Sequence, residues 1–230
     1  MSPPPKLAVL FDLDGTLLDT IELLLNSVRH AFRNRTGRVP TTEEWIAGIG
    51  TPLASQLRVY ATDDADLNAL IEGYRDYQRA HHDELTRAYD DVLATVAALH
   101  AEGHRMAVVT SKANDIATRS IAFVGLDRYI EIMVGYDSTT SHKPNPAPVA
   151  HALAALGVPP AAAVFVGDSP HDMLAGNAAG VITVGALWGP FSRAALMGAA
   201  PRYTLDRIRD LPALLDRLTE SPPSTPPSAV

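Results

Sequence analysis

The sequence predicts an α/β fold: a parallel sheet covered by helices on both faces, with an all-helical unit inserted after the first strand. Helical patterns separate the later strands, and this alternation indicates parallel pairing. Segment 20–86 interrupts the alternation because it contains helical patterns only. The strands are recognised as almost continuous apolar runs, typical of strands buried on both faces. The five runs cover residues 7–11, 105–109, 130–134, 163–166 and 181–184.

The inserted unit is predicted to contain four helices. The first carries an apolar stripe at helical spacing, and Gly37 can end it. This stripe consists of Ile21, Leu24, Leu25, Val28 and Phe32. A second helix is predicted to begin after Thr41 or Thr42 as N-cap, and two more cover residues 53–60 and 65–80. Between the later strands, helices are predicted at residues 92–100, 148–156 and 173–179.

These elements divide the chain into two predicted domains and a tail. The core is predicted to span residues 1–18 and 87–219, and the helical cap residues 19–86. Residues 220–230 are mostly Pro and Ser, a composition typical of a flexible segment without packed structure.

Composition excludes several classes of protein. Of the 230 residues, 47% are hydrophobic, enough for a substantial core. The net charge of −7 and the lack of a long basic run argue against nucleic acid as a main partner. The chain has no cysteine, which excludes disulfides, thiolate metal sites and cysteine nucleophiles. No apolar stretch is long enough for a membrane span, and the N-terminal apolar run is too short for a signal peptide. We therefore expect a cytoplasmic protein.

Four polar groups follow predicted strands, and in an open parallel sheet these strand ends meet at one edge, where ligands bind. The first group is Asp12-Leu13-Asp14-Gly15-Thr16. Two carboxylates so close together need a shared cation or proton, and Gly15 permits a sharp turn. The same residues taken alone could form a surface turn.

Thr110 and Ser111 follow the second strand, where a hydroxyl group can donate to a phosphate oxygen; Ser111 could instead be a helix N-cap. Lys143 precedes a proline, and the following Asn145 and Pro146 are a candidate N-cap and first helical residue. Lys143 would then stand at a helix N-terminus, where an anion is favoured. A solvated surface lysine is the alternative.

The last group is Gly167-Asp168-Ser169-Pro170-His171-Asp172. Asp168 and Asp172 are one helical turn apart and can face one cation, and their hard oxygens suit Mg²⁺. Helix capping by one aspartate is the alternative.

Together, these four groups resemble the motifs of the haloacid dehalogenase-like (HAD) superfamily. The resemblance extends from about Leu7 to Leu215. It implies a Rossmann-like core, and the helical insert resembles the cap of the phosphoglycolate phosphatase-like branch.

The resemblance also implies roles for individual residues. Asp12 would attack phosphorus and form an aspartyl-phosphate, and Asp14 would act as general acid and base. Mg²⁺ would be held by Asp12, the backbone carbonyl of Asp14, and Asp168, with Asp172 close by. Phosphate oxygens would be bound by residues near the first three strand ends: Thr110, Ser111, Lys143 and the backbone around Leu13.

The cap is expected to close over the site, with hinges near residues 17–19 and 87–90. Substrate specificity is expected from the loop at residues 48–52, including Thr51. Arg58 is a candidate cation for the far end of the substrate, with a solvated helix arginine as the alternative. Residues 81–84 are of metal-ligand types, but we interpret them as a solvated helix end.

The predicted activity is Mg²⁺-dependent hydrolysis of a small phosphorylated metabolite, with phosphoglycolate as first candidate. Inorganic pyrophosphatase is the close second candidate. The resemblance implies it because the segments Trp188-Gly189-Pro190 and Thr110-Ser111-Lys112 also occur among pyrophosphatases of this superfamily. Nucleoside or sugar monophosphatase and β-phosphoglucomutase are further alternatives, although Thr16 favours a phosphatase over a mutase. A non-catalytic binding protein is the alternative from another class, and the filled motifs argue against it. A monomer and a homodimer are both compatible with the sequence.

Overall fold

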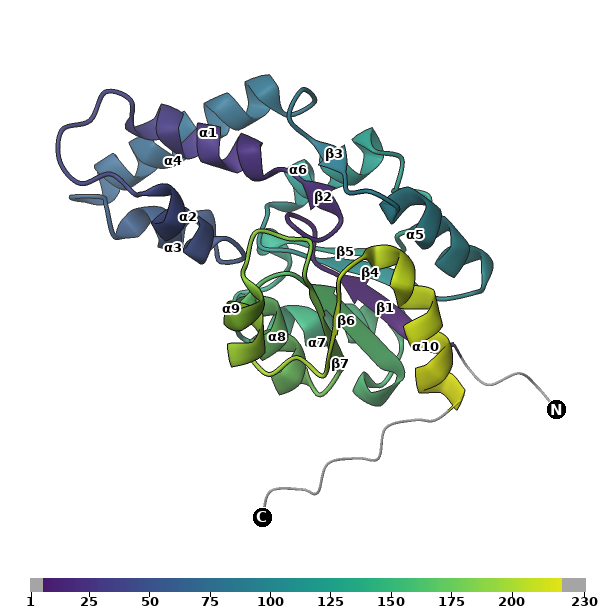
Figure 1. Ribbon diagram of the computed structural model, residues 1–230. Helices are drawn as coiled ribbons and strands as arrows, with labels where there is room; N and C mark the ends of the chain where they lie inside the picture. The colour runs from purple at the N-terminus through teal and green to yellow at the C-terminus, as the bar shows by residue number, and fades with distance from the viewer. Residues whose placement is uncertain (1–5, 221–230) are drawn as a thin grey trace, which may run out of the picture.

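The computed structural model describes residues 6–220, and it shows a sheet-containing core beside a group of helices (Figure 1). The core sheet has six parallel strands in the order β5-β4-β1-β6-β7-β8. They are β1 Ala8–Phe11, β4 Met106–Val109, β5 Ile132–Val134, β6 Ala163–Gly167, β7 Ile182–Ala186 and β8 Tyr203–Leu205. The predicted fold class is confirmed. The order reverses around β1, and in such sheets this is where ligands bind.

Side chains that alternate along β1 separate the core into two apolar layers. Val9 and Phe11 face one layer, and Ala8 and Leu10 face the other. The first layer packs against α5 Val92–Ala101, α6 Asn114–Phe123 and α10 Leu211–Glu220. The second packs against α7 Ala147–Leu156 and α8 Pro170–Ala179, and α9 Arg193–Gly198 lies beside α8. Short 3₁₀ turns lie at Tyr136–Ser138, Pro160–Ala162 and Ile208–Asp210.

The inserted unit consists of α1 Ile21–Phe32, α2 Thr42–Gly48, α3 Leu53–Arg58 and α4 Asp64–His81, with an apolar cluster of its own. Thr41 is the N-cap of α2 and forms a capping box with Glu44. The helix α1 ends at Phe32, earlier than Gly37. Its apolar stripe packs within the cap, mainly against α4.

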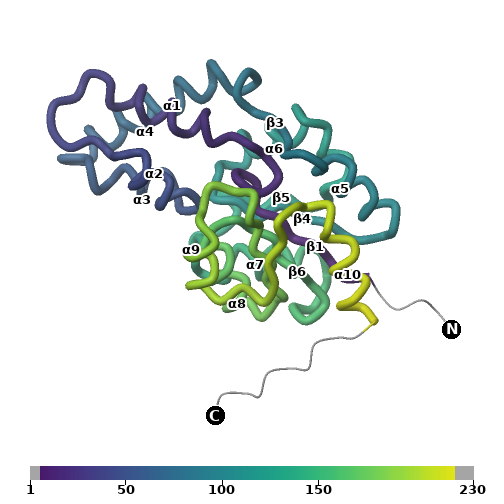
Figure 2. Tube along the Cα trace, viewed as in Figure 1, coloured from purple at the N-terminus to yellow at the C-terminus, as the bar shows by residue number. Residues whose placement is uncertain are grey.

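Two chain crossings join the cap to the core, as the tube in Figure 2 shows. They form a short antiparallel pair between β2 Leu18–Asp19 and β3 Arg87–Ala88. The predicted domain limits at residues 19 and 86 lie at these crossings, and independent core and cap domains stay a prediction. Glu220, which was predicted to begin the tail, is the last residue of α10; the rest of the predicted tail lies outside the described residues.

The prediction of a solvated helix end at residues 81–84 is wrong for His82. This side chain is buried, and its ring contacts Asp83 at 2.6 Å and the Ser120 hydroxyl of α6 at 2.8 Å. The end of the cap thus docks on the core, and both ring nitrogens have protein partners. Within residues 6–220, no helix has the length and apolarity that crossing a membrane requires.

Candidate active site

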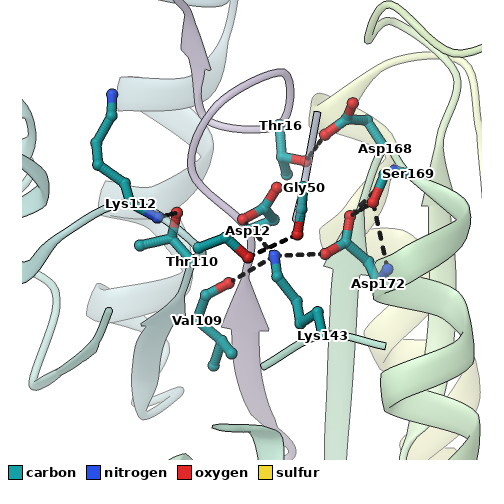
Figure 3. A network of polar contacts seen from close by, with 11 residues as sticks. Asp12, Thr16, Gly50, Val109, Thr110, Lys112, Lys143, Asp168, Ser169 and Asp172 are labelled. Carbon is teal, nitrogen blue, oxygen red and sulfur yellow. Dashed lines mark hydrogen bonds and ion pairs between the residues drawn. The ribbon is translucent and has the colours of Figure 1, made fainter. Parts of the chain in front are cut away.

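Three buried aspartates meet at the carboxyl ends of the two central strands (Figure 3). Asp12 follows β1, Asp168 follows β6, and Asp172 lies in the first turn of α8. Each offers a carboxylate oxygen, and the three oxygens lie within 4.8 Å of one another. The structure therefore brings the aspartates of the first and last motifs together at one edge of the sheet.

Lys143 joins two of these aspartates. Its Nζ donates to Asp12 Oδ1 at 2.8 Å, to Asp172 Oδ1 at 2.6 Å and to the carbonyl of Val109 at 3.2 Å. Burial alone would lower the pKa of Lys143, but attraction to the two carboxylates outweighs it and raises the pKa. All three ammonium hydrogens are engaged. Lys143 must give up one of these bonds before it can bind a phosphate oxygen.

The helix that follows Lys143 starts one residue later than the sequence predicted. The N-cap of α7 is Pro146, and the first helical residue is Ala147. Asn145 still contributes, since its side-chain oxygen accepts a hydrogen bond from the N–H of Ala147 at 2.9 Å.

Asp172 caps a helix and also belongs to the acidic cluster. Its Oδ2 accepts hydrogen bonds from the N–H and the hydroxyl of Ser169, at 3.0 and 2.6 Å, within a capping box. Its Oδ1 binds Lys143. The structure therefore shows the capping role, and binding of a cation by Asp172 stays a prediction.

The acidic cluster is not electrically balanced by Lys143 alone. Burial, followed by repulsion from Asp172, raises the pKa of Asp12 to about 7, although Lys143 and the N–H of Leu13 oppose the rise. Burial and the neighbouring Asp12 also hold the pKa of Asp168 well above its ordinary value. A shared cation would relieve both effects.

The cluster fits a hard divalent cation such as Mg²⁺. Asp168 Oδ1 accepts from the Thr16 hydroxyl at 2.8 Å, whereas its Oδ2 is buried with no hydrogen-bond partner. An orphaned carboxylate oxygen beside two further carboxylates is a natural ligand set for such an ion. The Asp14 carboxylate is outside this group of oxygens, so metal binding by Asp14 through its backbone stays a prediction.

Asp14 contacts two residues to which the sequence analysis assigned no role. Its Oδ1 accepts hydrogen bonds from the Thr20 hydroxyl at 2.6 Å and from Lys112 Nζ at 2.7 Å. The sequence could have indicated Lys112 as a site residue, because it lies two residues after Thr110. The sequence gives no indication that Lys112 pairs with Asp14, because 98 residues separate them in the chain.

The other predicted phosphate-binding residues have different environments. Thr110 is buried beside Asp12, and its hydroxyl oxygen accepts from the N–H of Lys112 at 3.2 Å, which leaves the hydroxyl hydrogen to donate. Ser111 donates to the carbonyl of Gly50 in the cap at 2.6 Å. It is not a helix N-cap, because α6 begins after Ala113. Ser111 therefore fastens the cap loop to the core.

A cavity of about 670 Å³ lies between core and cap. Asp12, Asp14 and Thr110 line its core side, and Thr51 lines its cap side. Arg58 does not line it: the side chain is half exposed and pairs with Asp64, so the alternative interpretation of Arg58 is the correct one. Three other cations line the cavity: Lys112, Arg75 and Arg79.

The loop at Trp188 and Gly189 packs directly against the first and last motifs. Trp188 Nε1 donates to the carbonyl of Thr16 at 2.9 Å. A Cβ atom at Gly189 would lie 2.4 Å from the Cβ of Asp168 and 2.7 Å from the carbonyl oxygen of Gly15. Neither neighbour can move away without displacing the acidic cluster.

We therefore expect Gly189→Ala to lower the free energy of unfolding by about 1–3 kcal/mol through overpacking, and to weaken Mg²⁺ binding. Chemical denaturation with and without Mg²⁺ would measure both effects. Gly198→Ala is the matched control, because a Cβ there meets nothing within 4 Å. Equal stability of the two variants would contradict the expectation.

Comparison with known proteins agrees with this geometry. The family model described as haloacid dehalogenase-like hydrolase matches residues 9–186. This chain belongs to that family. The predicted membership of the HAD superfamily is thereby confirmed. Together with the relatives and the solved structure described next, the match also confirms the predicted enzyme class, a HAD-type phosphatase.

The curated relatives match over nearly their whole length. "Putative pyrophosphatase PpaX" of Caldanaerobacter subterraneus is 38% identical over 89% of this chain and 92% of its own length. "Pyrophosphatase PpaX" of Anoxybacillus flavithermus is 35% identical, over 90% and 95%. Among solved structures, a predicted phosphoglycolate phosphatase from Haemophilus somnus superimposes with a TM-score of 0.82 at 25% identity, covering 90% of this chain and 96% of that one.

Proposed function

We propose that this chain is a Mg²⁺-dependent phosphohydrolase that forms an aspartyl-phosphate on Asp12. The observation that supports it most strongly is the buried cluster of Asp12, Asp168 and Asp172, with an unpartnered Asp168 oxygen, beside a cavity that also contains Asp14. Mg²⁺, when bound between these carboxylates, would allow an anionic nucleophile to approach an anionic phosphorus.

Catalysis then requires two displacements at phosphorus. The Asp12 carboxylate attacks phosphorus, and the bond from phosphorus to the leaving oxygen breaks while Asp14 donates its proton to that oxygen. Asp14 next takes a proton from water, and the hydroxide attacks phosphorus. Inorganic phosphate leaves and the Asp12 carboxylate is restored. Thr110 donates to a non-bridging oxygen.

The cap supports this sequence of steps by restricting access. Its loop reaches the core through the bond between Ser111 and the carbonyl of Gly50, next to the acidic cluster. A closed cap would keep water away until the first displacement is complete.

Pyrophosphate is our first candidate substrate and phosphoglycolate the second. The relatives at 35–38% identity are named pyrophosphatases, whereas the phosphoglycolate phosphatase resemblance comes from more distant structures. This changes the order that the sequence alone favoured. The cytoplasmic location and the lack of a nucleic-acid or membrane partner stay predictions.

The test is phosphate release from a panel at neutral pH, with Mg²⁺ and with a chelator. The panel contains pyrophosphate, phosphoglycolate, nucleoside monophosphates, sugar phosphates and β-glucose 1-phosphate. We expect turnover that falls at least about 100-fold when Mg²⁺ is removed, with pyrophosphate or phosphoglycolate hydrolysed fastest. A rate of phosphate release that is unchanged by the chelator would refute the metal-dependent mechanism. Conversion of β-glucose 1-phosphate into its 6-phosphate isomer would indicate a mutase instead.

A further inference from the structure

Lys112 is a cation whose side chain is almost enclosed and which has hydrogen-bonding capacity to spare. Only 6% of its side chain is exposed, and the residue lines the cavity. An ammonium group has three hydrogens to donate. Among residues 6–220, Asp14 Oδ1 is the one partner found for Nζ. Since Lys112 lines the cavity, an anionic ligand bound there can accept the remaining ammonium hydrogens.

The position of Lys112 decides which part of a substrate it meets. Figure 3 shows Thr110 and Lys112 on one side of Asp12, with Asp168 and Asp172 on the other. In the proposed mechanism, Asp14 contacts the leaving oxygen, and Lys112 Nζ lies 2.7 Å from that carboxylate. The ammonium group therefore stands beside the leaving group, away from the acidic cluster.

The other cations near the site are less suited to this task. Lys143 has all its hydrogens engaged by Asp12, Asp172 and Val109. Arg75 and Arg79 line the cavity from α4, but both are about half exposed and lie 3.6 Å from Glu72 of their own helix. Charge pairs at exposed positions contribute little to affinity, whereas a desolvated cation contributes more.

We propose that Lys112 is a specificity-determining residue that binds a second anionic group on the leaving-group side of the substrate. This rests on the proposed function and deepens it: the preferred substrates carry two anionic groups joined by a short link. The second phosphate of pyrophosphate and the carboxylate of phosphoglycolate both fit this description. Lys112 keeps its bond to Asp14 and gives one further hydrogen to the anion.

The test compares substrates with and without the second anion in Lys112→Met and Lys112→Arg. Because Lys112 also contacts Asp14, the readout is the ratio of kcat/KM for pyrophosphate or phosphoglycolate to kcat/KM for p-nitrophenyl phosphate. We expect Lys112→Met to lower this ratio by about 30-fold or more, since it removes a charge-assisted bond. Lys112→Arg should preserve it within about fivefold. An equal loss on all substrates would show that Lys112 only positions Asp14, and the proposal would be wrong.

A binding measurement separates this proposal from the proposed function. Calorimetry with the intact protein and fixed free Mg²⁺ would compare methylenediphosphonate with methylphosphonate, neither of which is hydrolysed. We expect the first to bind more tightly to the wild type, and Lys112→Met to remove the difference. If the wild type releases phosphate from no compound, the proposed function fails, but this comparison still decides the role of Lys112. Equal binding of the two probes by the wild type would overturn the proposal.

Two arginine variants complete the design. Arg58→Met removes a cap cation that is outside the cavity, and it should leave the ratio unchanged. Arg75→Met removes a cation at the cavity's cap side. If Arg75→Met abolishes the preference and Lys112→Met does not, the second anion is bound by the cap and the assignment to Lys112 is refuted. Thermal unfolding of each variant verifies that it is folded.

Discussion

Asp12→Asn is expected to lower kcat for phosphate release by about 10⁴-fold or more, while the protein stays folded. Removing a catalytic nucleophile has effects of this size or larger in other hydrolases. The amide of asparagine has nearly the same shape as the carboxylate, and its oxygen can still accept a hydrogen bond from Lys143. It cannot form an acyl-phosphate under these conditions. The loss should therefore appear in chemistry rather than in folding.

The measurement combines steady-state phosphate release with acid quenching of the wild type on a labelled substrate. A phosphorylated protein intermediate should be trapped in the wild type and be missing in Asp12→Asn. Asp115→Asn makes the same chemical change at an exposed position on the rim of the same cavity, and it should alter kcat by less than about threefold. If Asp12→Asn retains turnover within tenfold of the wild type, Asp12 is not the nucleophile.

The acidic cluster was predictable because each of its signals is local. A strand shows in a run of apolar residues, and the parallel sheet brings the ends of strands together. Asp12 and Asp168 could thus be brought to one edge without knowledge of any contact between them. The Mg²⁺ hypothesis followed from the same pattern, since carboxylates that converge need a cation.

The remaining features depend on contacts between distant parts of the chain. The sequence does not show that Lys112 meets Asp14, or that the Thr16 hydroxyl meets Asp168 across 152 residues. The sequence offered Arg58 as a candidate cap cation, with a solvated helix arginine as the alternative. Which side of α3 and α4 faces the cavity depends on cap packing, and there Arg75 lines the cavity whereas Arg58 does not. The strand β8 is three residues long and only partly buried, too short for an apolar run to reveal it.

The metal-free protein is expected to lose stability as pH rises from 5 to 8. Asp12 has its pKa raised from 3.8 to about 7 in the folded chain, first by burial and then by Asp172, and that of Asp168 is also raised. Between pH 3.8 and about pH 7, Asp12 holds a proton in the folded chain that it has released in the unfolded chain. The free energy of unfolding therefore falls as pH rises through this range. For Asp12 alone the change between pH 5 and pH 8 is on the order of 3 kcal/mol. The melting temperature should fall by roughly 10 °C.

Other groups titrate in the same range, so a variant must isolate the cluster. Burial lowers the pKa of His171, and this acts in the opposite sense, because stability then rises with pH below the ordinary value of 6.5. Asp168→Asn removes one buried charge and keeps the shape. Without metal, its melting temperature should exceed that of the wild type at pH 8 and depend less on pH. Asp206→Asn, at an exposed pair with Arg193, should behave like the wild type.

At pH 8, saturating Mg²⁺ should raise the melting temperature of the wild type above that of Asp168→Asn, the reverse of their order without metal. At pH 8, above the raised pKa of Asp12, that carboxyl group is ionised and the positive ion offsets its charge, so the melting temperature rises steeply with Mg²⁺ concentration. At pH 5 protons occupy the same oxygens and compete with the ion, and the rise is smaller. Asp168→Asn lacks a carboxylate of the cluster and should respond weakly at both pH values. A wild type whose melting temperature responds equally to Mg²⁺ at pH 5 and pH 8 would contradict a metal site built on Asp12 and Asp168, because protonation of Asp12 at pH 5 should weaken the response.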